Sequence, residues 1–342
     1  MSSAVRTVVV VAFPGVQALD LTGPHEVLDA ANRVLVGRGE DPAYSVRVAA
    51  REPGRIRTES GLVLHADHRL DDQACDTVIV PGGDGVSDAA RDPALLAWLT
   101  AATGRARRTC SVCSGAFVLA AAGLLDGRTV TTHWARAAQL AHRYPAVRVE
   151  PDALHHRDGS IWTSAGVTAG IDLTLALVED DLGADVAQTV ARWLVMFLRR
   201  PGGQSQFAAP VWTEAPRSDP IRAARALIHA DPAGDLRLDT HAGRVGLSGR
   251  QLSRAFAAEV GVPPGRYVEQ VRVEHARRLL ERRDLTVAAV ARAVGYGSAE
   301  SLRRAFLRQV GVAPDAWRHR FALSPATTKE SPCASPSSCS PA

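Results

Sequence analysis

Over roughly the first 200 residues, short continuous apolar runs alternate with longer segments in which apolar residues recur every three or four positions. The short runs, rich in Val, Ile and Thr, predict buried strands, and the longer segments predict helices with one apolar face. Because the two kinds alternate, we expect an α/β unit with a parallel sheet covered by helices on both faces. The predicted strands are Val5–Ala12, Ser45–Ala50, Thr77–Val80, Arg108–Val112, Thr129–Thr132 and Ile161–Thr163.

The predicted helices of this part extend to residue 198. They are Pro24–Val36, Pro93–Ala102, Ala116–Ala122, Ala135–Tyr144, Gly170–Leu182 and Asp185–Leu198. We therefore place the first domain at residues 5–200. Residues 201–220 are rich in Gly and Pro and predict a linker, and every periodic segment in residues 221–322 is helical. The Ser/Pro-rich residues 323–342 predict a disordered tail.

The helical part contains an internal repeat with an offset of 50 residues. Of the 17 aligned positions that start at Ser248 and Ser298, nine are identical. Ser248 and Ser298 are good N-cap residues, and Gly261 can end a helix in the left-handed conformation. A short helix that ends in Val-Gly precedes each cap, so each copy predicts a helix-turn-helix whose second helix enters the major groove of DNA.

The segment HARRLLERRDLTVAAVARAVGYGSAESLRRAF, with the repeat, resembles the DNA-binding domain of the AraC family. The resemblance implies base reading from the first turns of both recognition helices. Arg suits guanine, and Glu can accept from cytosine; contact with phosphate, or local pairing, is the alternative for these arginines. His241 occupies a position that is usually aliphatic in the family, which implies looser packing. The implied reading positions are Gly249, Arg250, Ser253 and Arg254 in the first helix, and Ala299, Glu300, Ser301, Arg303 and Arg304 in the second.

Charge is distributed unevenly between the two parts. Residues 1–214 carry 20 basic and 24 acidic side chains, whereas residues 215–342 carry 20 basic and 12 acidic ones. The basic half agrees with double-stranded DNA as a partner. Five cysteines, no signal-peptide pattern and no apolar run of membrane-spanning length lead us to expect a reduced cytoplasmic protein without a membrane partner.

The run VCSGAFVLAAAGLL joins a strand directly to a helix through Cys113. A sharp strand-to-helix turn of this kind exposes a nucleophile at a helix N-terminus, and we expect the helix dipole to lower the pKa of the thiol. Glycines after an earlier strand, in VIVPGGDG, could present backbone N–H groups to an anion. Both turns should lie at the carboxyl edge of the sheet, where such folds bind ligands.

Residues from about Val8 to Phe207 resemble the PfpI-like, class I glutamine-amidotransferase-like fold, which is flavodoxin-like. Its fusion to an AraC-type module resembles the GlxA group of transcriptional regulators. Matching segments include TTHW, TSAGVTAGIDL and GGQSQF. The resemblance implies that Cys113 is the elbow cysteine, Asp20 the acid that approaches it and His133 a nearby histidine. It further implies an oxyanion-hole-like pair at Gly83 and Ser114.

One departure from that pattern bears on activity. PfpI-like proteases have a histidine directly after the cysteine, and this chain has Ser114. We therefore expect a small-molecule sensor and not an enzyme. There are two alternatives. One is residual enzymatic turnover, because the segment FPGVQALDLTGPHEVL resembles isocyanide hydratases. The other is a domain that serves only as a dimer scaffold. We expect no metal and no cofactor. The expected partners are DNA, an unidentified small effector, a second copy in a homodimer and RNA polymerase.

Overall fold

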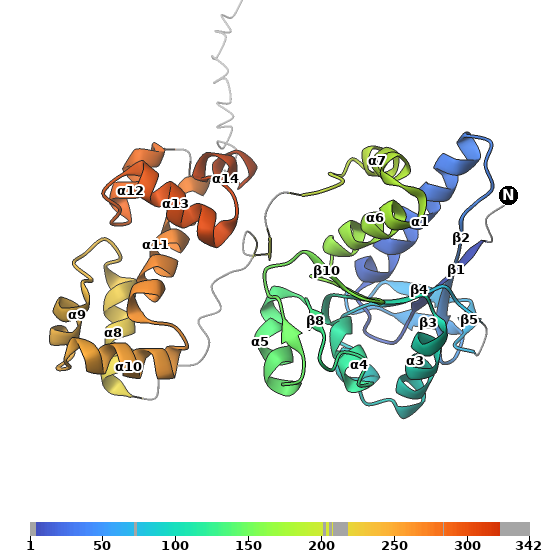
Figure 1. Cartoon of the computed structure of the whole chain (residues 1–342), viewed down its shortest axis with the longest axis horizontal. Helices are drawn as coiled ribbons and strands as arrows, with labels where there is room; N and C mark the ends of the chain where they lie inside the picture. The colour runs from blue at the N-terminus through green and yellow to red at the C-terminus, as the bar shows by residue number, and fades with distance from the viewer. Residues whose placement is uncertain are drawn as a thin grey trace, which may run out of the picture. The chain divides into compact units, whose positions relative to one another are not determined.

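The computed structural model describes residues 5–71, 74–200, 203–204, 207, 218–282 and 284–321. The chain divides into two compact units, Met1–Trp212 and Thr213–Ala342. We call them the α/β unit and the helical unit (Figure 1). The predicted tail at residues 323–342, and most of the predicted linker, lie outside the described residues.

A seven-stranded sheet forms the centre of the α/β unit, in the order β10-β11-β7-β6-β1-β2-β5. Neighbouring strands run parallel, except that the edge strand β10 is antiparallel to β11. All four residues of β6 are buried, which explains why a strand covered on both faces appears in the sequence as a continuous apolar run. The strands are β1 Arg6–Val11, β2 Tyr44–Ala50, β5 His68–Arg69, β6 Thr77–Val80, β7 Arg108–Val112, β10 His155–Asp158 and β11 Ile161–Ser164.

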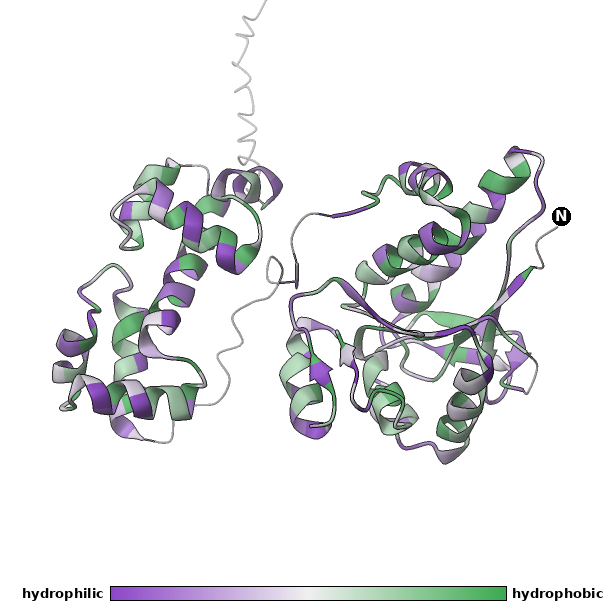
Figure 2. Ribbon diagram, in the orientation of Figure 1, coloured by the Kyte–Doolittle hydropathy of each residue, from purple (hydrophilic) through white to green (hydrophobic). Residues whose placement is uncertain are grey.

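Helices cover both faces of this sheet, as the sequence predicts. On one face, α1 packs against α6 and α7; on the other lie α2, α3 and α4 (Figure 1). The central strands β1 and β6 are predominantly hydrophobic, whereas the edge strand β10 is polar (Figure 2). The flavodoxin-like α/β prediction is thereby confirmed. The helices are α1 Ala18–Gly37, α2 Val86–Ala89, α3 Pro93–Arg105, α4 Ala116–Ala121, α5 Trp134–Arg143, α6 Ala169–Leu182 and α7 Ala184–Trp193.

Several segments differ from the sequence prediction. The run at Thr129 does not join the central sheet; β8 (Thr129–Val130) pairs with β9 (Arg148–Val149) in a separate two-stranded sheet. Helix α7 stops at Trp193, five residues early, and Val195 then adopts a φ of 56°, which a right-handed helix cannot accommodate. The hairpin of β3 (Gly54–Arg57) and β4 (Val63–Ala66) was not predicted, because strands of only four residues give a weak periodic signal.

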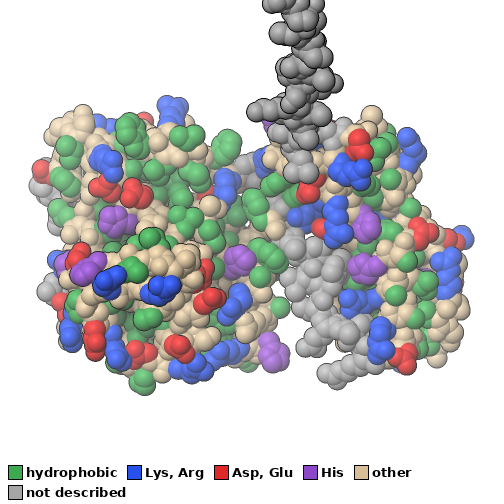
Figure 3. Space-filling model, turned by 180° about the vertical axis from the view of Figure 1, so that it is seen from behind, with side chains coloured by type: hydrophobic (Ala, Val, Ile, Leu, Met, Phe, Trp, Pro, Cys, Tyr) green, Lys and Arg blue, Asp and Glu red, His purple; other side chains and the backbone are tan. Residues whose placement is uncertain are grey.

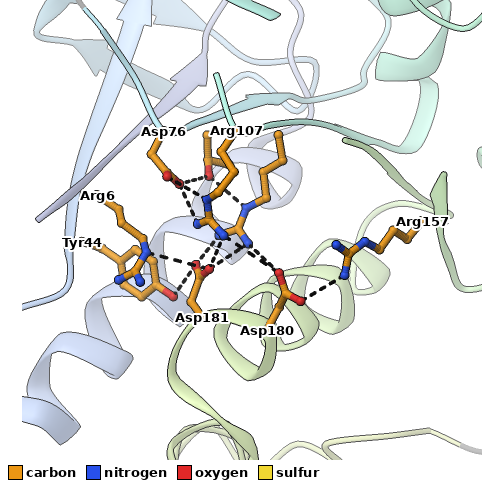
Figure 4. Close-up of polar contacts among 9 residues, drawn as sticks. Arg6, Tyr44, Asp76, Arg107, Arg157, Asp180 and Asp181 are labelled. Carbon is orange, nitrogen blue, oxygen red and sulfur yellow. Dashed lines mark hydrogen bonds and ion pairs between the residues drawn. The ribbon is translucent and has the colours of Figure 1, made fainter. Parts of the chain in front are cut away.

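A buried ionic cluster closes the amino-terminal edge of the sheet (Figure 4). Asp181, near the end of α6, accepts hydrogen bonds from Tyr44 Oη at 3.0 Å and from Arg108 Nη1 at 3.1 Å. Arg107 Nη1 lies 2.7 Å from the same carboxylate. Hydrogen bonds from these arginines oppose the effect of burial and hold the pKa of Asp181 below its ordinary value. This cluster fastens α6 to the strand ends farthest from Cys113.

The helical unit contains two helix-turn-helix motifs joined by a long helix (Figure 1). In the first, α9 leads through Gly246 to α10; in the second, α12 leads through Gly295 to α13. Helix α11 separates the motifs, and Val271 and Leu280 are among its buried residues. The prediction of two helix-turn-helix motifs is confirmed. The helices are α8 Asp219–Ala230, α9 Leu238–Arg244, α10 Gly249–Val260, α11 Pro264–Glu281, α12 Val287–Ala293, α13 Ala299–Val310 and α14 Pro314–Phe321.

Helix ends in this unit follow the capping chemistry of the repeat. Ser248 and Gln251 form a reciprocal capping box at the start of α10, and Ser298 accepts a hydrogen bond from Ser301 N at the start of α13. Helix α10 ends at Gly261, whose φ is 84°. His241 is 1% exposed, so the position expected to pack loosely is enclosed. None of the described helices is long and apolar enough to cross a membrane.

Candidate functional sites

The sharp turn at Cys113 has a strained backbone and requires glycine at two neighbouring positions. Cys113 follows β7 directly and has a φ of 56°, unusual for a residue with a side chain. A Cβ atom on Gly166 would lie 2.3 Å from Cys113 Cβ, and one on Gly115 would lie 2.2 Å from the carbonyl oxygen of Val80. Only glycine fits at either position, so the elbow predicted from the sequence is present.

Asp20 lies beside the thiol at the start of α1. Its side chain accepts hydrogen bonds from Gly82 N at 3.0 Å and from Val167 N at 2.8 Å, and it also hydrogen-bonds Cys113. The residue is 0% exposed. Burial raises the pKa of Asp20 from 3.8 to about 6, although the two N–H donors oppose the change. The acid therefore does approach the cysteine.

The expected lowering of the thiol pKa is wrong. Burial, and next the negative charge of Asp20, raise the pKa of Cys113 to about 12. Hydrogen bonds from Ser114 act in the opposite direction but are outweighed. Helix α4 begins after a 3₁₀ turn and is six residues long, close to its predicted bounds, so the burial of the thiol and the charge of Asp20 account for the error. At neutral pH the resting thiol is protonated.

Gly83 and Ser114 meet, but the Gly83 N–H is engaged by the Ser114 hydroxyl, and the Ser114 N–H is directed to Cys113. Gly83 N donates a hydrogen bond to Ser114 Oγ at 3.1 Å. A Cβ on Gly83 would lie 2.4 Å from Gln17 N, so the close approach of these loops requires glycine. Since the Gly83 N–H is already engaged, a ligand would have to displace Ser114 Oγ to use it as the implied oxyanion donor.

His133 does not reach the thiol. Its Nδ1 accepts the N–H of Ala135 at 3.3 Å, as the N-cap of α5, and burial lowers its pKa. Among the described residues, no hydrogen bond or ion pair joins His133 to Cys113. Its neighbour Thr132 makes the contact instead, donating from Oγ1 to the carbonyl oxygen of Cys113 at 2.7 Å. Thr132 lies in the TTHW segment, but the sequence does not reveal this contact with Cys113.

Glu59 is a second residue that the sequence did not indicate. It lies between β3 and β4 and accepts from Gln17 Nε2 at 2.6 Å and from Asp84 N at 3.0 Å. Its charge helps to raise the pKa of both Asp20 and Cys113. The hairpin thus brings a further carboxylate toward the elbow, which no local pattern could reveal.

A cavity of about 480 Å³ opens at the carboxyl ends of β1 and β2, next to these loops. Its apolar lining includes Phe13, Ile56 and Leu95, and its charged lining includes Arg51 and Asp92, which pair at 3.2 Å. Cys113 is not among the lining residues. The carboxyl edge of the sheet therefore has room for a small molecule beside the elbow, while the elbow itself is closely packed.

The two recognition helices present different side chains to solvent. On α10, Arg250 and Arg254 are exposed and Ser253 is half-buried, and no acidic side chain among the described residues forms an ion pair with either arginine. On α13, Glu300 accepts from Arg303 Nε at 2.7 Å and from Arg303 Nη2 at 2.8 Å. Basic side chains spread over much of the visible face of the helical unit (Figure 3).

Arg304 lies farther from the same carboxylate, at 4.0 Å. Hydrogen bonding by Arg303 also lowers the pKa of Glu300. Local pairing, the alternative to base reading, thus holds for Arg303 in the unbound chain. The first helix offers two unpaired guanidinium groups, whereas the second offers an internally neutralised pair beside Arg304 and the half-buried Ser301.

Comparison with known proteins bears on both sites. The DJ-1/PfpI family model matches residues 6–180, and a helix-turn-helix domain model matches residues 241–320. The chain belongs to the DJ-1/PfpI family. Within that family it joins the elbow domain to a helix-turn-helix domain, the combination implied by its resemblance to the GlxA group.

Two similar proteins that are named transcriptional regulators align with most of this chain. The HTH-type transcriptional regulator Rv1931c of Mycobacterium tuberculosis is 36% identical over 72% of this chain and 96% of its own length. The HTH-type transcriptional regulator GlxA of Rhizobium meliloti is 32% identical over 86% of this chain and 90% of its own length. An isonitrile hydratase of Pseudomonas putida is 37% identical, but over only 52% of this chain and 73% of its own length.

Solved structures agree on the fold. A ThiJ/PfpI family protein from Pseudomonas syringae has a TM-score of 0.52 at 27% identity and covers 67% of this chain and 88% of its own. Drosophila melanogaster DJ-1beta has a TM-score of 0.50 at 20% identity and covers 56% of this chain and 99% of its own, which supports the fold alone.

Proposed function

We propose that the chain is a sequence-specific DNA-binding transcriptional regulator whose α/β unit binds a small-molecule effector. The observation that carries the proposal is the pair of capped recognition helices in the repeat, α10 and α13, each preceded by a short helix and a glycine turn. Two such helices can enter successive major grooves, which lie about 34 Å apart on one face of B-DNA.

Base recognition would differ between the two helices. Arg250 and Arg254 on α10 are free to bind guanine O6 and N7 in a bidentate manner. On α13, Arg303 must leave Glu300 before it can contact a base or a phosphate. The released Glu300 can then accept from cytosine N4. Unequal helices favour a non-palindromic site, in which the first half depends more strongly on guanine.

The effector would bind at the carboxyl edge of the sheet. The elbow brings together Asp20, Gly83, Cys113 and Ser114. His133 follows Thr132, whose hydroxyl donates a hydrogen bond to the carbonyl oxygen of Cys113. The adjoining cavity of about 480 Å³ has the size of a small-molecule site. The resting thiol, whose pKa is raised to about 12, supports binding over nucleophilic catalysis.

Homodimerisation is also part of the proposal. Trp193 and Phe197 are each 70% exposed, so they are not core residues, and large apolar side chains at a surface favour contact with another protein surface. Analytical ultracentrifugation of the wild type and of a Trp193→Ser, Phe197→Ser variant tests this point. A monomeric wild type would refute it. Contact with RNA polymerase remains a prediction from family resemblance.

A binding assay on the DNA upstream of the gene tests the regulator proposal. We expect the specific complex to exceed binding to bulk DNA at the same salt concentration. Arg250→Ala should weaken it by about 1–3 kcal/mol, or roughly 5- to 150-fold, because a bidentate base contact is lost. Arg91→Ala, an exposed arginine of the α/β unit, is the matched control and should change nothing. Equal affinity for all DNA would refute sequence-specific regulation.

A cysteine-dependent enzyme is the second candidate, favoured by the hydrogen bond between Asp20 and Cys113 and by the identity with the isonitrile hydratase. Turnover of isocyanides and amides, compared with a Cys113→Ala variant, separates the two functions. Product formation that disappears in the variant would establish residual catalysis. Absence of Cys113-dependent product would leave the elbow as a binding site.

A further inference from the structure

Gln204, which the sequence places in a linker, is fastened into the α/β unit next to the elbow. It is 2% exposed. Its Nε2 donates to the carbonyl oxygens of Thr132 at 2.9 Å and Ala153 at 3.0 Å, and lies 3.1 Å from Thr131 Oγ1. Its Oε1 accepts the N–H of Trp134 at 2.7 Å. A buried amide that is this well satisfied holds its segment in one position.

Two neighbours reinforce this attachment. A Cβ on Gly203 would lie 2.3 Å from the carbonyl oxygen of Asp152, so the segment approaches as closely as only glycine allows. Arg200 donates to the buried Asp172, with 2.9 Å between Nε and Oδ1, and to Thr168 Oγ1 at 3.4 Å. We call Arg200, Gly203 and Gln204 the anchor. The anchor immediately precedes the segment that leads to the helical unit.

Gln204 and Arg200 each contact a loop that forms part of the elbow. Thr132, whose carbonyl oxygen binds Gln204, donates through its own hydroxyl to the carbonyl oxygen of Cys113 at 2.7 Å. Thr168, which binds Arg200, follows Val167, whose N–H donates to Asp20 at 2.8 Å. A displacement of either elbow loop therefore acts on a hydrogen bond of the anchor.

We propose that the anchor is coupled to the elbow, so that occupancy of the Cys113 site releases Arg200 and Gln204 and frees the connection to the helical unit. This inference rests on the effector site proposed above. Partial release is unfavourable, because the buried carbonyl oxygen of Thr132 and the half-buried N–H of Trp134 would lose Gln204 as their partner together. The anchor thus has two states, seated and released. Coupling is reciprocal, so releasing the anchor must also loosen the elbow.

The test uses the full chain without DNA or effector, with iodoacetamide as the probe. Peptide mass spectrometry follows alkylation of Cys113, and hydrogen exchange follows residues 131–136 and 200–207. Gly203→Ala should unseat the anchor, raise exchange in both segments and accelerate alkylation of Cys113 at least about tenfold. Gly104→Ala, for which an added Cβ meets open space, is the matched control and should leave both rates unchanged.

Thr132 provides the discriminating variant. In the wild type, alkylation of Cys113 should raise exchange in residues 200–207. Thr132→Val lacks the hydroxyl that bonds Cys113 and should greatly reduce this increase in exchange. Thr132→Ser keeps a hydroxyl and should show the wild-type increase. An anchor that is merely structural would not distinguish Val from Ser in this way.

Three outcomes would overturn the coupling. In the first, Gly203→Ala raises exchange in residues 200–207 but leaves Cys113 alkylation within twofold of wild type. In the second, neither Gly203→Ala nor Gln204→Ala raises that exchange, so the anchor is not what holds the segment. In the third, an effector binds at the elbow without changing exchange in residues 200–207; the proposed function would then survive and the coupling would not.

Discussion

Replacing Asp20 with Asn should change how the stability of the α/β unit depends on pH. The pKa of Asp20 is about 6 in the folded chain and 3.8 as its ordinary value. Between these values the unfolded carboxyl is ionised while the folded one keeps its proton, so stability falls as pH rises. A difference of about two pH units corresponds to about 3 kcal/mol in total. Below about pH 3 and above about pH 7 the contribution of Asp20 is nearly constant.

The asparagine side chain of the Asp20→Asn variant carries no charge at any pH, so the variant escapes this loss. Its amide faces two backbone donors, at Gly82 and Val167, and only its oxygen can accept, which costs about 1–3 kcal/mol at every pH. The difference in unfolding free energy between variant and wild type should therefore move by about 2 kcal/mol in favour of the variant from pH 4 to pH 8.

Urea titrations read by hydrogen exchange of peptides from β1 and β7 measure this difference within the α/β unit. Asp29→Asn, an exposed position on the same helix, is the control and should follow the wild-type profile. If the curves of wild type and Asp20→Asn run parallel from pH 4 to pH 8, burial does not destabilise the ionised carboxyl, and the raised pKa of Asp20 is wrong.

Three further variants test other parts of the structure. Gly166→Ala should destabilise the α/β unit by about 3 kcal/mol in a urea titration, because its Cβ would overlap Cys113; an unchanged midpoint would contradict the packing. Glu300→Ala should release Arg303 and strengthen non-specific DNA binding, with a salt slope steeper by up to about 1; an unchanged slope would count against the pair. Because burial lowers the pKa of His241, His241→Leu should remove a loss of stability that the wild type shows as pH falls through about 6.5, and a wild-type profile in the variant would refute this.

Most of the fold could be predicted from local pattern. Strands β6 and β7 match their predicted bounds, because buried strands of a parallel sheet form continuous runs between helical segments. The pairing of β8 with β9 could not be predicted, since two-residue strands carry no periodicity and their partner is chosen by the packing around them. Capping residues at Ser248 and Ser298 gave the starts of both recognition helices for a local reason that the structure bears out.

The site was predictable where one segment carries the whole motif. The elbow follows from strand, Cys-Ser-Gly and helix in succession, and Arg250 is implied by the resemblance of its segment to the AraC family. Thr132 and Gln204 lie in the family-matching segments TTHW and GGQSQF, whereas Glu59 lies in no such segment. The roles of all three could not be predicted, because each acts through a contact between segments distant in the sequence. The thiol pKa was misjudged for a related reason: the helix N-terminus is visible in the sequence, whereas burial against Asp20 is not.

The backbone strain around the elbow constrains what the site can do. Cys113 and Val167 have φ values of 56° and 51°, conformations that cost about 1–3 kcal/mol each in residues with side chains. An enzyme would use such strain to expose a reactive thiolate, but the raised pKa of Cys113 removes that benefit in the resting state. The loops at Cys113 and Val167 nevertheless keep their strained conformations, because they are hydrogen-bonded to Thr132 and to Asp20 respectively. A ligand shifts such loops only if it binds their strained and relaxed forms with different affinity. On the proposed function, the effector would therefore contact these loops themselves, and a molecule confined to the outer part of the adjoining cavity would bind without being sensed.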